Sequence, residues 1–376
     1  MKNDMLGLIF SENPEASMGE LTSMRSLAAV PVGGRYRIID FILSNMVNSG
    51  IVKVGITTPV NYQSLNDHLG TGKAWDMDRK DDGLYILPPK DTGESSEKQL
   101  GGGIDVLEGV LPFLNKSKQE YMLVADCNTI CNIDFDAALE YHMEKQADIT
   151  LIYTEVGELT TKDLKRHILL DVKDGDVEDI YVYPRKQKSN YSYMHMFLIK
   201  RELLMELVED AMAHGYHTIS KDIFIANLNK LNIAAYEFNG YKKKIDSIQS
   251  YYCFNLDLLK KEVRDELFGL NNDSPIYTKI KDTVPTKYSR TAEVENSFIA
   301  DGCKIEGSVK NCILFRGVHI GRGTSVENCI IMQDSEIMDN CLLENVIFDK
   351  GVVLRSGKKL VGQDTYPMVI GKNTVI

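Results

Sequence analysis

The sequence predicts an α/β protein in two parts, a Rossmann-like domain followed by a parallel β-helix. Segments typical of strands and helices alternate up to about Tyr252, and a short repeat replaces them after Glu293. The chain of 376 residues, 43% of them hydrophobic, is long enough to bury the cores of two domains. We expect residues 1–255 to form the first domain, 256–292 a linker and 293–376 the β-helix.

The first part alternates between two hydrophobic periods. "IVKVGITT" (51–58) and "ADITLIYTEV" (147–156) are typical of strands, whereas "FDAALEYHMEKQ" (135–146) and "IKRELLMELVEDAMAHG" (199–215) are typical of amphipathic helices. This alternation favours a mostly parallel sheet with crossover helices. In "LLDVKDGDVEDIYVY" (169–183) an Asp-Gly pair separates two strand patterns, which predicts a β-hairpin.

The second part carries a repeat. The triplet Asn-Cys-Ile/Leu begins at Asn311, Asn328 and Asn340, with spacings of 17 and 12 residues that lie close to multiples of six. A hexapeptide-type repeat of this kind predicts a parallel β-helix whose apolar positions face inward. The cysteine of each triplet then belongs to the packing between coils. Because the same solenoid serves many functions, the function has to be sought in the first part.

Composition excludes several classes of function. The formal net charge of −11 opposes binding to nucleic acid or to an anionic membrane, since both need clustered Lys and Arg. The apolar stretch at the start is too short for a signal peptide, and no later run approaches about 18 apolar residues, so we expect a cytoplasmic protein. Seven cysteines suit a reducing compartment, and Cys127 and Cys131 have no second pair at zinc-ligand spacing.

The block "AAVPVGGRYRIIDFILSNMVNSGI" (28–51) resembles the glucose-1-phosphate adenylyltransferases, also called ADP-glucose pyrophosphorylases. Further similar blocks follow in the family's order: "SLNDHLGTGKAWDMDR" (64–79), "GGGIDVL" (101–107), "GYKKKIDSIQSYYCFNLDLL" (240–259) and "VIFDKGV" (346–352). The resemblance implies a Rossmann-like, GT-A-like nucleotidyltransferase domain and a β-helix that is left-handed. It also implies a reaction in which ATP and glucose 1-phosphate give ADP-glucose and pyrophosphate with the help of Mg²⁺.

Aligned with this family, the phosphate-binding positions of the chain are altered. The glycines of the family's first loop fall on Glu12, Asn13 and Glu15, and its arginine falls on Ser17. Two carboxylates would therefore stand beside a polyanion, where glycine N–H groups otherwise approach phosphate. The family's phosphate-facing lysine falls on Leu27, which cannot donate a hydrogen bond.

The metal-binding positions are altered as well. The two aspartates that the family uses for Mg²⁺ fall on Asn128 and Lys244. An amide is a weaker ligand for a hard cation, and an ammonium at 4 Å repels Mg²⁺ by about 8 kcal/mol at an effective dielectric of 20. Asp126 and Asp246 each lie two positions away and are weak substitutes. We therefore expect this chain to bind no metal.

The sugar-binding positions carry larger side chains. The family's Glu-Lys-Pro falls on Val182, Tyr183 and Pro184, and its Ser-Met-Gly falls on residues 193–195. His195 has no carboxylate in register, so we expect it to be a structural histidine.

These differences favour a catalytically silent or very weak regulatory subunit, a pseudoenzyme that keeps the fold and modifies a catalytic sister subunit. By resemblance the two would form a heterotetramer in glycogen biosynthesis, with Mg²⁺ in the catalytic partner; a homo-oligomer is the alternative assembly. Arg25, Arg35 and Arg37 are candidates for binding an anionic effector, or else they only hold a domain interface.

Two other functions stay open. The chain is an active or weakly active adenylyltransferase in its own right if Asp126 and Asp246 hold the metal. Alternatively, the β-helix is an acyltransferase, for which His319 is the candidate histidine.

Overall fold

The computed structural model describes residues 4–12, 16–59, 61–89, 103–270 and 273–376. The chain divides into two compact units, neither of which is continuous in sequence. Their ranges are Met1–Glu15, Phe41–Tyr62 and Leu69–Lys242 for unit 1, and Ala16–Asp40, Gln63–His68 and Lys243–Ile376 for unit 2. Unit 2 thus combines the C-terminal part of the chain with two short stretches from near its beginning.

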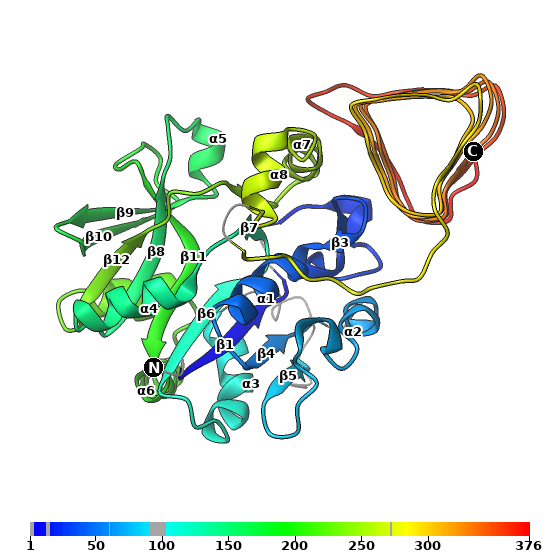
Figure 1. The fold of residues 1–376 in the computed structure, drawn as a ribbon. Coiled ribbons are helices and arrows are strands. Elements are labelled where there is room, and N and C mark those ends of the chain that lie inside the picture. Colours follow the sequence, from blue (N-terminus) through cyan, green and yellow to red (C-terminus); the bar gives the residue numbers. More distant parts are fainter. Residues whose placement is uncertain (1–3, 13–15, 60, 90–102, 271–272) are drawn as a thin grey trace. The chain divides into compact units, whose positions relative to one another are not determined.

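Unit 1 is built on a mixed sheet, which confirms the α/β prediction (Figure 1). Within the described residues it has nine strands in the order β5-β4-β1-β6-β11-β8-β12-β10-β9. Strand β1 pairs in parallel with β4 and β6, whereas β11 runs antiparallel to β6 and β8. The strands are Met5–Phe10 (β1), Lys53–Thr57 (β4), Gly83–Leu87 (β5), Tyr121–Asp126 (β6), Ile149–Glu155 (β8), Ile168–Lys173 (β9), Asp176–Val182 (β10), Tyr191–Lys200 (β11) and Ile233–Glu237 (β12).

The local patterns explain these elements. All six residues of β1 are buried, and a Cβ on Gly7 would lie 2.6 Å from Met46 Sδ, so only glycine allows this close packing. Strands β9 and β10 form the predicted hairpin, with Asp174 and Gly175 at positive φ in its turn. The carboxylate of Asp134 caps the helix that follows it by accepting a hydrogen bond from Asp136 N–H.

The predicted helices at 135–146 and 199–215 are present as α4 and α6. The α-helices are Ile38–Asn48 (α1), Gln63–Leu69 (α2), Ile104–Asn115 (α3), Phe135–Glu144 (α4), Thr161–Leu164 (α5), Arg201–Ala213 (α6), Ile248–Asp257 (α7) and Lys261–Leu267 (α8). None of the helices in the described ranges has the length and apolarity that crossing a bilayer requires.

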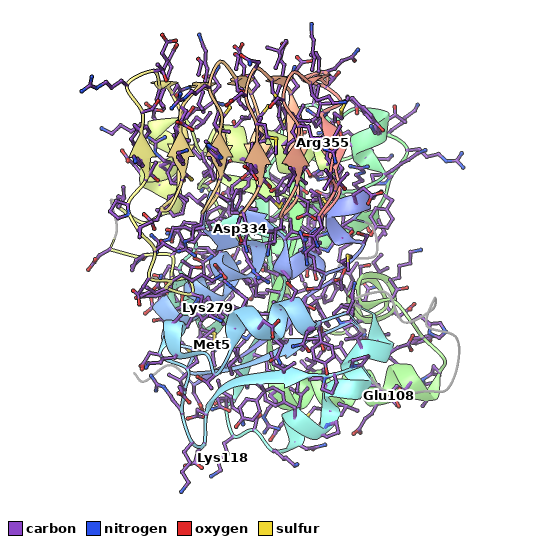
Figure 2. All side chains as sticks on the ribbon, turned by 90° about the vertical axis from the view of Figure 1, so that its right-hand side faces the viewer. Met5, Glu108, Lys118, Lys279, Asp334 and Arg355 are labelled. Atoms are coloured by element: carbon purple, nitrogen blue, oxygen red, sulfur yellow. The ribbon has the colours of Figure 1, made fainter. Side chains whose placement is uncertain are left out.

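The C-terminal part of unit 2 is a left-handed parallel β-helix, as expected. Figure 1 looks along its axis and shows a triangular section, and Figure 2 shows its strands side by side. Its three faces are parallel sheets with the strand orders β14-β17-β20-β23-β26, β15-β18-β21-β24-β27 and β16-β19-β22-β25-β28. Representative bounds are Lys287–Tyr288 (β14), Ile313–Leu314 (β19), His319–Ile320 (β20), Ile330–Ile331 (β22) and Val346–Phe348 (β25).

The repeat of the β-helix differs from the one expected. Asn311, Asn328 and Asn345 share one corner at intervals of 17 residues, each with φ near +50°, which asparagine tolerates better than most residues. Asn340 is at another corner, where its N–H bonds to Arg322 O (2.9 Å). The Asn-Cys triplet at 340 was therefore wrongly grouped with the other two, because the same tight turn recurs at more than one corner of a coil.

The boundary between the parts also differs from the segment boundaries expected from sequence. Helix α8 and strand β14 both lie within the segment 256–292. The first coil begins at Lys287, since β14 pairs with Lys304–Ile305 (β17) of the next coil. The described part of the expected linker is therefore partly regular structure.

Candidate functional site

A basic cavity of about 180 Å³ lies within unit 2. It is smaller than the roughly 300 to 1,000 Å³ typical of pockets for drug-sized ligands, so a small molecule or ion would fill it. Its walls come from the segment 31–37, the end of α2, the stretch before the β-helix and one corner of the β-helix itself. The lining residues are Pro31, Gly34, Arg35, Tyr36, Arg37, Asp67, His68, Lys279, Lys281, Phe315, Arg316, Gln333 and Lys350.

The β-helix contributes a ladder of polar side chains to this cavity. Arg316, Gln333 and Lys350 are 17 residues apart and follow the strands β19, β22 and β25. The backbone holds them in register, since Asp334 N–H bonds to Arg316 O and Gly351 N–H bonds to Gln333 O, both at 3.0 Å. Successive coils thus present one side chain each to the same cavity.

The cavity has an excess of positive charge. Six of its lining residues are Arg or Lys, against one carboxylate, Asp67. Arg37 Nη1 donates to the carbonyl (2.5 Å) and hydroxyl (3.0 Å) oxygens of Ser64, and Lys279 Nζ donates to Asp67 O (2.6 Å). These partners are backbone or hydroxyl oxygens, so they do not neutralise the charges they bind.

Burial makes these charges costly. It lowers the pKa of Arg37 to about 10, with the neighbouring Arg25 adding to the effect and Asp40 opposing it. Burial also lowers the pKa of Lys350 to about 7, assisted by Arg37 and Arg25. The pKa of Arg316 is lowered by burial and by Arg35. An anion in the cavity would relieve all of these costs at once.

One donor in the cavity lacks a partner. Within the described residues, the buried Nε of Arg316 has no hydrogen-bond acceptor. Buried donors are nearly always satisfied, and each exception needs an explanation. An oxyanion bound beside Arg316 would supply the acceptor.

The three predicted effector residues have different surroundings. Arg35 and Arg37 line the cavity. Arg25 does not, because its guanidinium is 3% exposed and bound to both carboxylate oxygens of Asp349 at 2.8–2.9 Å. A role in binding effector remains a prediction for Arg35 and Arg37, while Arg25 ties its segment to the β-helix.

The eroded sugar-binding positions in unit 1 contain an unexpected pair. His195 Nδ1 lies 3.5 Å from Asp126 Oδ2, so the expectation that no carboxylate faces this histidine was wrong. The pairing arises because β11 is irregular between Tyr193 and Phe197, and His195 adopts φ +57°, a conformation that favours glycine. Tyr193 packs on the imidazole with ring centroids 5.1 Å apart. Aromatic rings and this pair occupy the place that the family gives to the sugar.

The other sequence-predicted positions of unit 1 are distributed as follows. Glu12 is half-buried just after β1, and Asn128 is fully buried after β6. Tyr183 is at positive φ at the end of β10, with its N–H bonded to His167 O (3.2 Å). Asn13 and Glu15 lie outside the described residues.

In unit 2, the remaining positions serve local structure. Leu27 is buried in a 3-10 helix, Leu27–Ala29, and Ser17 N–H donates to Asp246 O (2.8 Å). The carboxylate of Asp246 accepts a hydrogen bond from Ser250 at the start of α7 (3.2 Å). Lys244 is half-buried at the end of the strand Lys242–Lys244 (β13).

These groups do not fit a magnesium site. The family's two aspartate positions carry a buried amide, Asn128, and an ammonium, Lys244. A search of the described residues finds no group of three or more His, Cys, Asp or Glu side chains placed to hold a metal ion. The cysteines are free, and burial raises the pKa of the Cys131 thiol to about 12, which makes it a poor ligand.

His319 is also engaged. Its Nε2 lies 3.1 Å from Glu306 and its Nδ1 lies 3.6 Å from Glu336 on the surface of the β-helix. The described structure gives no independent support to an acyltransferase site there.

Sequence reasoning missed four of the cationic residues that line the cavity: Lys279, Lys281, Arg316 and Lys350. A 17-residue period drawn through Arg316, Gln333 and Lys350 could have found the ladder. No comparable signal marks the two lysines, since they lie in a stretch without regular structure.

Comparisons with known proteins agree with this architecture. A family model described as nucleotidyl transferase matches residues 18–261, and one described as GlmU-like, C-terminal hexapeptide matches residues 281–366. The glucose-1-phosphate adenylyltransferase of Clostridium perfringens strain 13 is 31% identical over 389 residues, which cover 100% of this chain and 96% of that protein. The chain belongs to the glucose-1-phosphate adenylyltransferase family of nucleotidyl transferases.

Within the glucose-1-phosphate adenylyltransferase family, some relatives carry a different name. The glycogen biosynthesis protein GlgD of Bacillus subtilis is 37% identical over 373 residues, covering 99% of this chain and 97% of that protein. GlgD of Geobacillus stearothermophilus is 40% identical over 326 residues, covering 87% and 84%. The family resemblance deduced from the sequence blocks is thereby confirmed.

Proposed function

We propose that this chain is a catalytically degenerate, regulatory subunit of a glucose-1-phosphate adenylyltransferase in glycogen biosynthesis. The observation that carries the proposal is the buried Leu27 at the position where the family places a phosphate-facing lysine. A buried leucine cannot stabilise the charge that develops during nucleotidyl transfer, and such stabilisation supplies most of the catalysis in phosphoryl-transfer enzymes. The amide of Asn128 and the ammonium of Lys244 at the metal positions support the same conclusion.

The similarity to two proteins named GlgD supports a role in glycogen biosynthesis. We place the chain in the cytoplasm, in a heterotetramer with a catalytic adenylyltransferase subunit that binds Mg²⁺. A homo-oligomer is the assembly expected when that partner is absent.

The regulatory ligand proposed for unit 2 is a small oxyanion. The six cationic side chains of the cavity and the unsatisfied Nε of Arg316 support this class of ligand. Their positions on both the N-terminal segment 31–37 and the β-helix would let one anion join these parts of unit 2.

The alternative is an adenylyltransferase that is active by itself through Asp126 and Asp246. Two contacts argue against it: Asp126 faces His195 at 3.5 Å, and the carboxylate of Asp246 accepts a hydrogen bond from Ser250. A metal would have to displace both of these interactions.

The deciding experiment measures ADP-glucose formation from ATP, glucose 1-phosphate and Mg²⁺. It uses this chain alone, a catalytic adenylyltransferase subunit alone, and the two mixed. We expect no turnover by this chain alone, together with a changed rate or effector response in the mixture. Robust turnover by this chain alone, or a mixture that behaves like the catalytic subunit by itself, would contradict the proposal.

A variant separates the effector cavity from the assembly. Replacing Arg316 and Lys350 by alanine removes two of the six cavity charges and should abolish the effector response of the mixture. Lys358→Ala is the matched control, because Lys358 is an exposed lysine of the same β-helix that does not line the cavity.

A further inference from the structure

Lys350 is the cavity cation whose charge is least supported by its surroundings. The nearest carboxylate in sequence, Asp349, has both oxygens bound to Arg25 and also accepts the Lys350 backbone N–H at 2.7 Å. The other charges that act on its ammonium, those of Arg37, Arg25 and Lys372, are all positive. The side chain is thus crowded by like charges and only partly compensated.

The other titratable groups of the cavity have different constraints. Arg35, Arg37 and Arg316 are guanidinium groups, which stay protonated near neutral pH. Lys279 is hydrogen-bonded to Asp67 O, and Asp67 accepts a hydrogen bond from Gln63 (2.8 Å). Lys281 is an exposed lysine.

His68 is the second group that could exchange a proton near neutral pH. Its Nε2 is 2.6 Å from Asp40, which is itself fully buried and caps Arg37 N–H. Because a carboxylate already faces the imidazole, an anion arriving in the cavity changes its surroundings less than those of Lys350. Lys350, on the β-helix ladder between Arg37 and the Arg25–Asp349 pair, has no such carboxylate to itself.

We infer that the cavity binds its anion together with a proton, and that Lys350 is the group that takes this proton up. The inference rests on the proposed anion site and adds a rule for its regulation. An anion beside Lys350 stabilises the ammonium form, so binding raises the affinity of the side chain for a proton. By linkage, a lower proton concentration must weaken the binding of the anion.

The sign and size follow from the free state. With the pKa of Lys350 lowered to about 7, the ammonium is formed below that pH and lost above it. If only the ammonium form binds, affinity should fall about 30-fold between pH 6 and pH 8.5. At pH 7.5 the binding of one anion should take up about 0.8 proton.

Sulfate is the suitable probe, because it carries two charges throughout this range and exchanges no proton itself. Its binding to the full chain is measured by titration calorimetry at pH 7.5 and constant chloride, in buffers that differ in ionisation enthalpy. The slope of the observed enthalpy against the buffer enthalpy gives the number of protons taken up. The dissociation constant is then followed from pH 6 to pH 8.5.

Two substitutions identify the group. Lys350→Arg keeps a charge that is always protonated, so sulfate should bind without proton uptake and without the pH dependence. Lys350→Gln removes the charge, so sulfate should bind at every pH about as weakly as it binds the unmodified chain at pH 8.5. Lys358→Arg is the matched control and should keep both the uptake and the pH dependence.

The outcomes separate this inference from the proposed function. Sulfate binding without proton uptake would overturn the inference and leave the anion site standing. Uptake that persists in Lys350→Arg would overturn the role of Lys350 and point to His68. No sulfate binding at any pH would overturn the anion site itself, and this inference with it.

Discussion

The ion pair between Arg25 and Asp349 should be a major source of stability for unit 2. Its side chains are 3% and 1% exposed, and three N–O contacts of 2.8–2.9 Å join them. Removing one partner of such a pair leaves a buried charge without compensation, which costs about 3 to 5 kcal/mol. We expect about 3 kcal/mol for Asp349→Asn, since the amide oxygen can still accept one hydrogen bond, and more for Arg25→Met.

The measurement is the free energy of unfolding in urea, for both single variants and for the double variant Arg25→Met/Asp349→Asn. The double variant should lose much less than the sum of the single losses, with a coupling energy of at least about 2 kcal/mol. The losses should be similar in 0.05 M and 1 M NaCl, because a buried pair is screened little.

The exposed pair Arg79–Asp76 provides the control. Its N–O distance is 2.7 Å, but its side chains are 43% and 90% exposed, so Arg79→Met should cost less than about 1 kcal/mol. The reasoning is refuted if Asp349→Asn costs no more than this control, or if 1 M NaCl abolishes its effect.

Three further predictions concern other residues. The pKa of the buried His142 is lowered to about 4 by burial, so the unfolded chain binds a proton that the folded one rejects. Stability should therefore fall by up to about 3 kcal/mol as the pH drops from 6.5 to 4, and His142→Gln should flatten this acid limb in urea titrations. His195→Gly should unfold at a higher urea concentration than His195→Ala by about 1 kcal/mol, since glycine accepts φ +57° without strain; equal midpoints would contradict this. Lys244→Asp alone should create no ADP-glucose synthesis, because Leu27 and Asn128 remain; substantial turnover in that assay would contradict the proposed loss of the site.

The fold was predictable because its signals are local. Strand and helix periods identified β4, β8, α4 and α6, and a turn dipeptide identified the hairpin β9–β10. The β-helix was predictable as a class, but its period was misread. A short triplet cannot distinguish the corners of a coil, whereas the positive φ shared by Asn311, Asn328 and Asn345 can.

The site was harder to predict because its residues meet only after folding. The pairing of Asp126 with His195 depends on an irregular stretch of β11, which no alternating pattern reveals. Arg25 was grouped with Arg35 and Arg37 by proximity in sequence, yet its partner, Asp349, lies 324 residues away. Lys350 follows that aspartate directly, but its charge becomes informative only beside Arg37.

The same long-range pair has a consequence for synthesis. Arg25 emerges from the ribosome early, and its carboxylate partner follows 324 residues later. The stretches Ala16–Asp40 and Gln63–His68 must therefore wait, with their final contacts in unit 2 unmade, until almost the whole chain has been translated. A fragment beginning at residue 243 would bury Asp349 without its counter-ion, so the β-helix of this protein is not a portable module that can be cut at the expected linker.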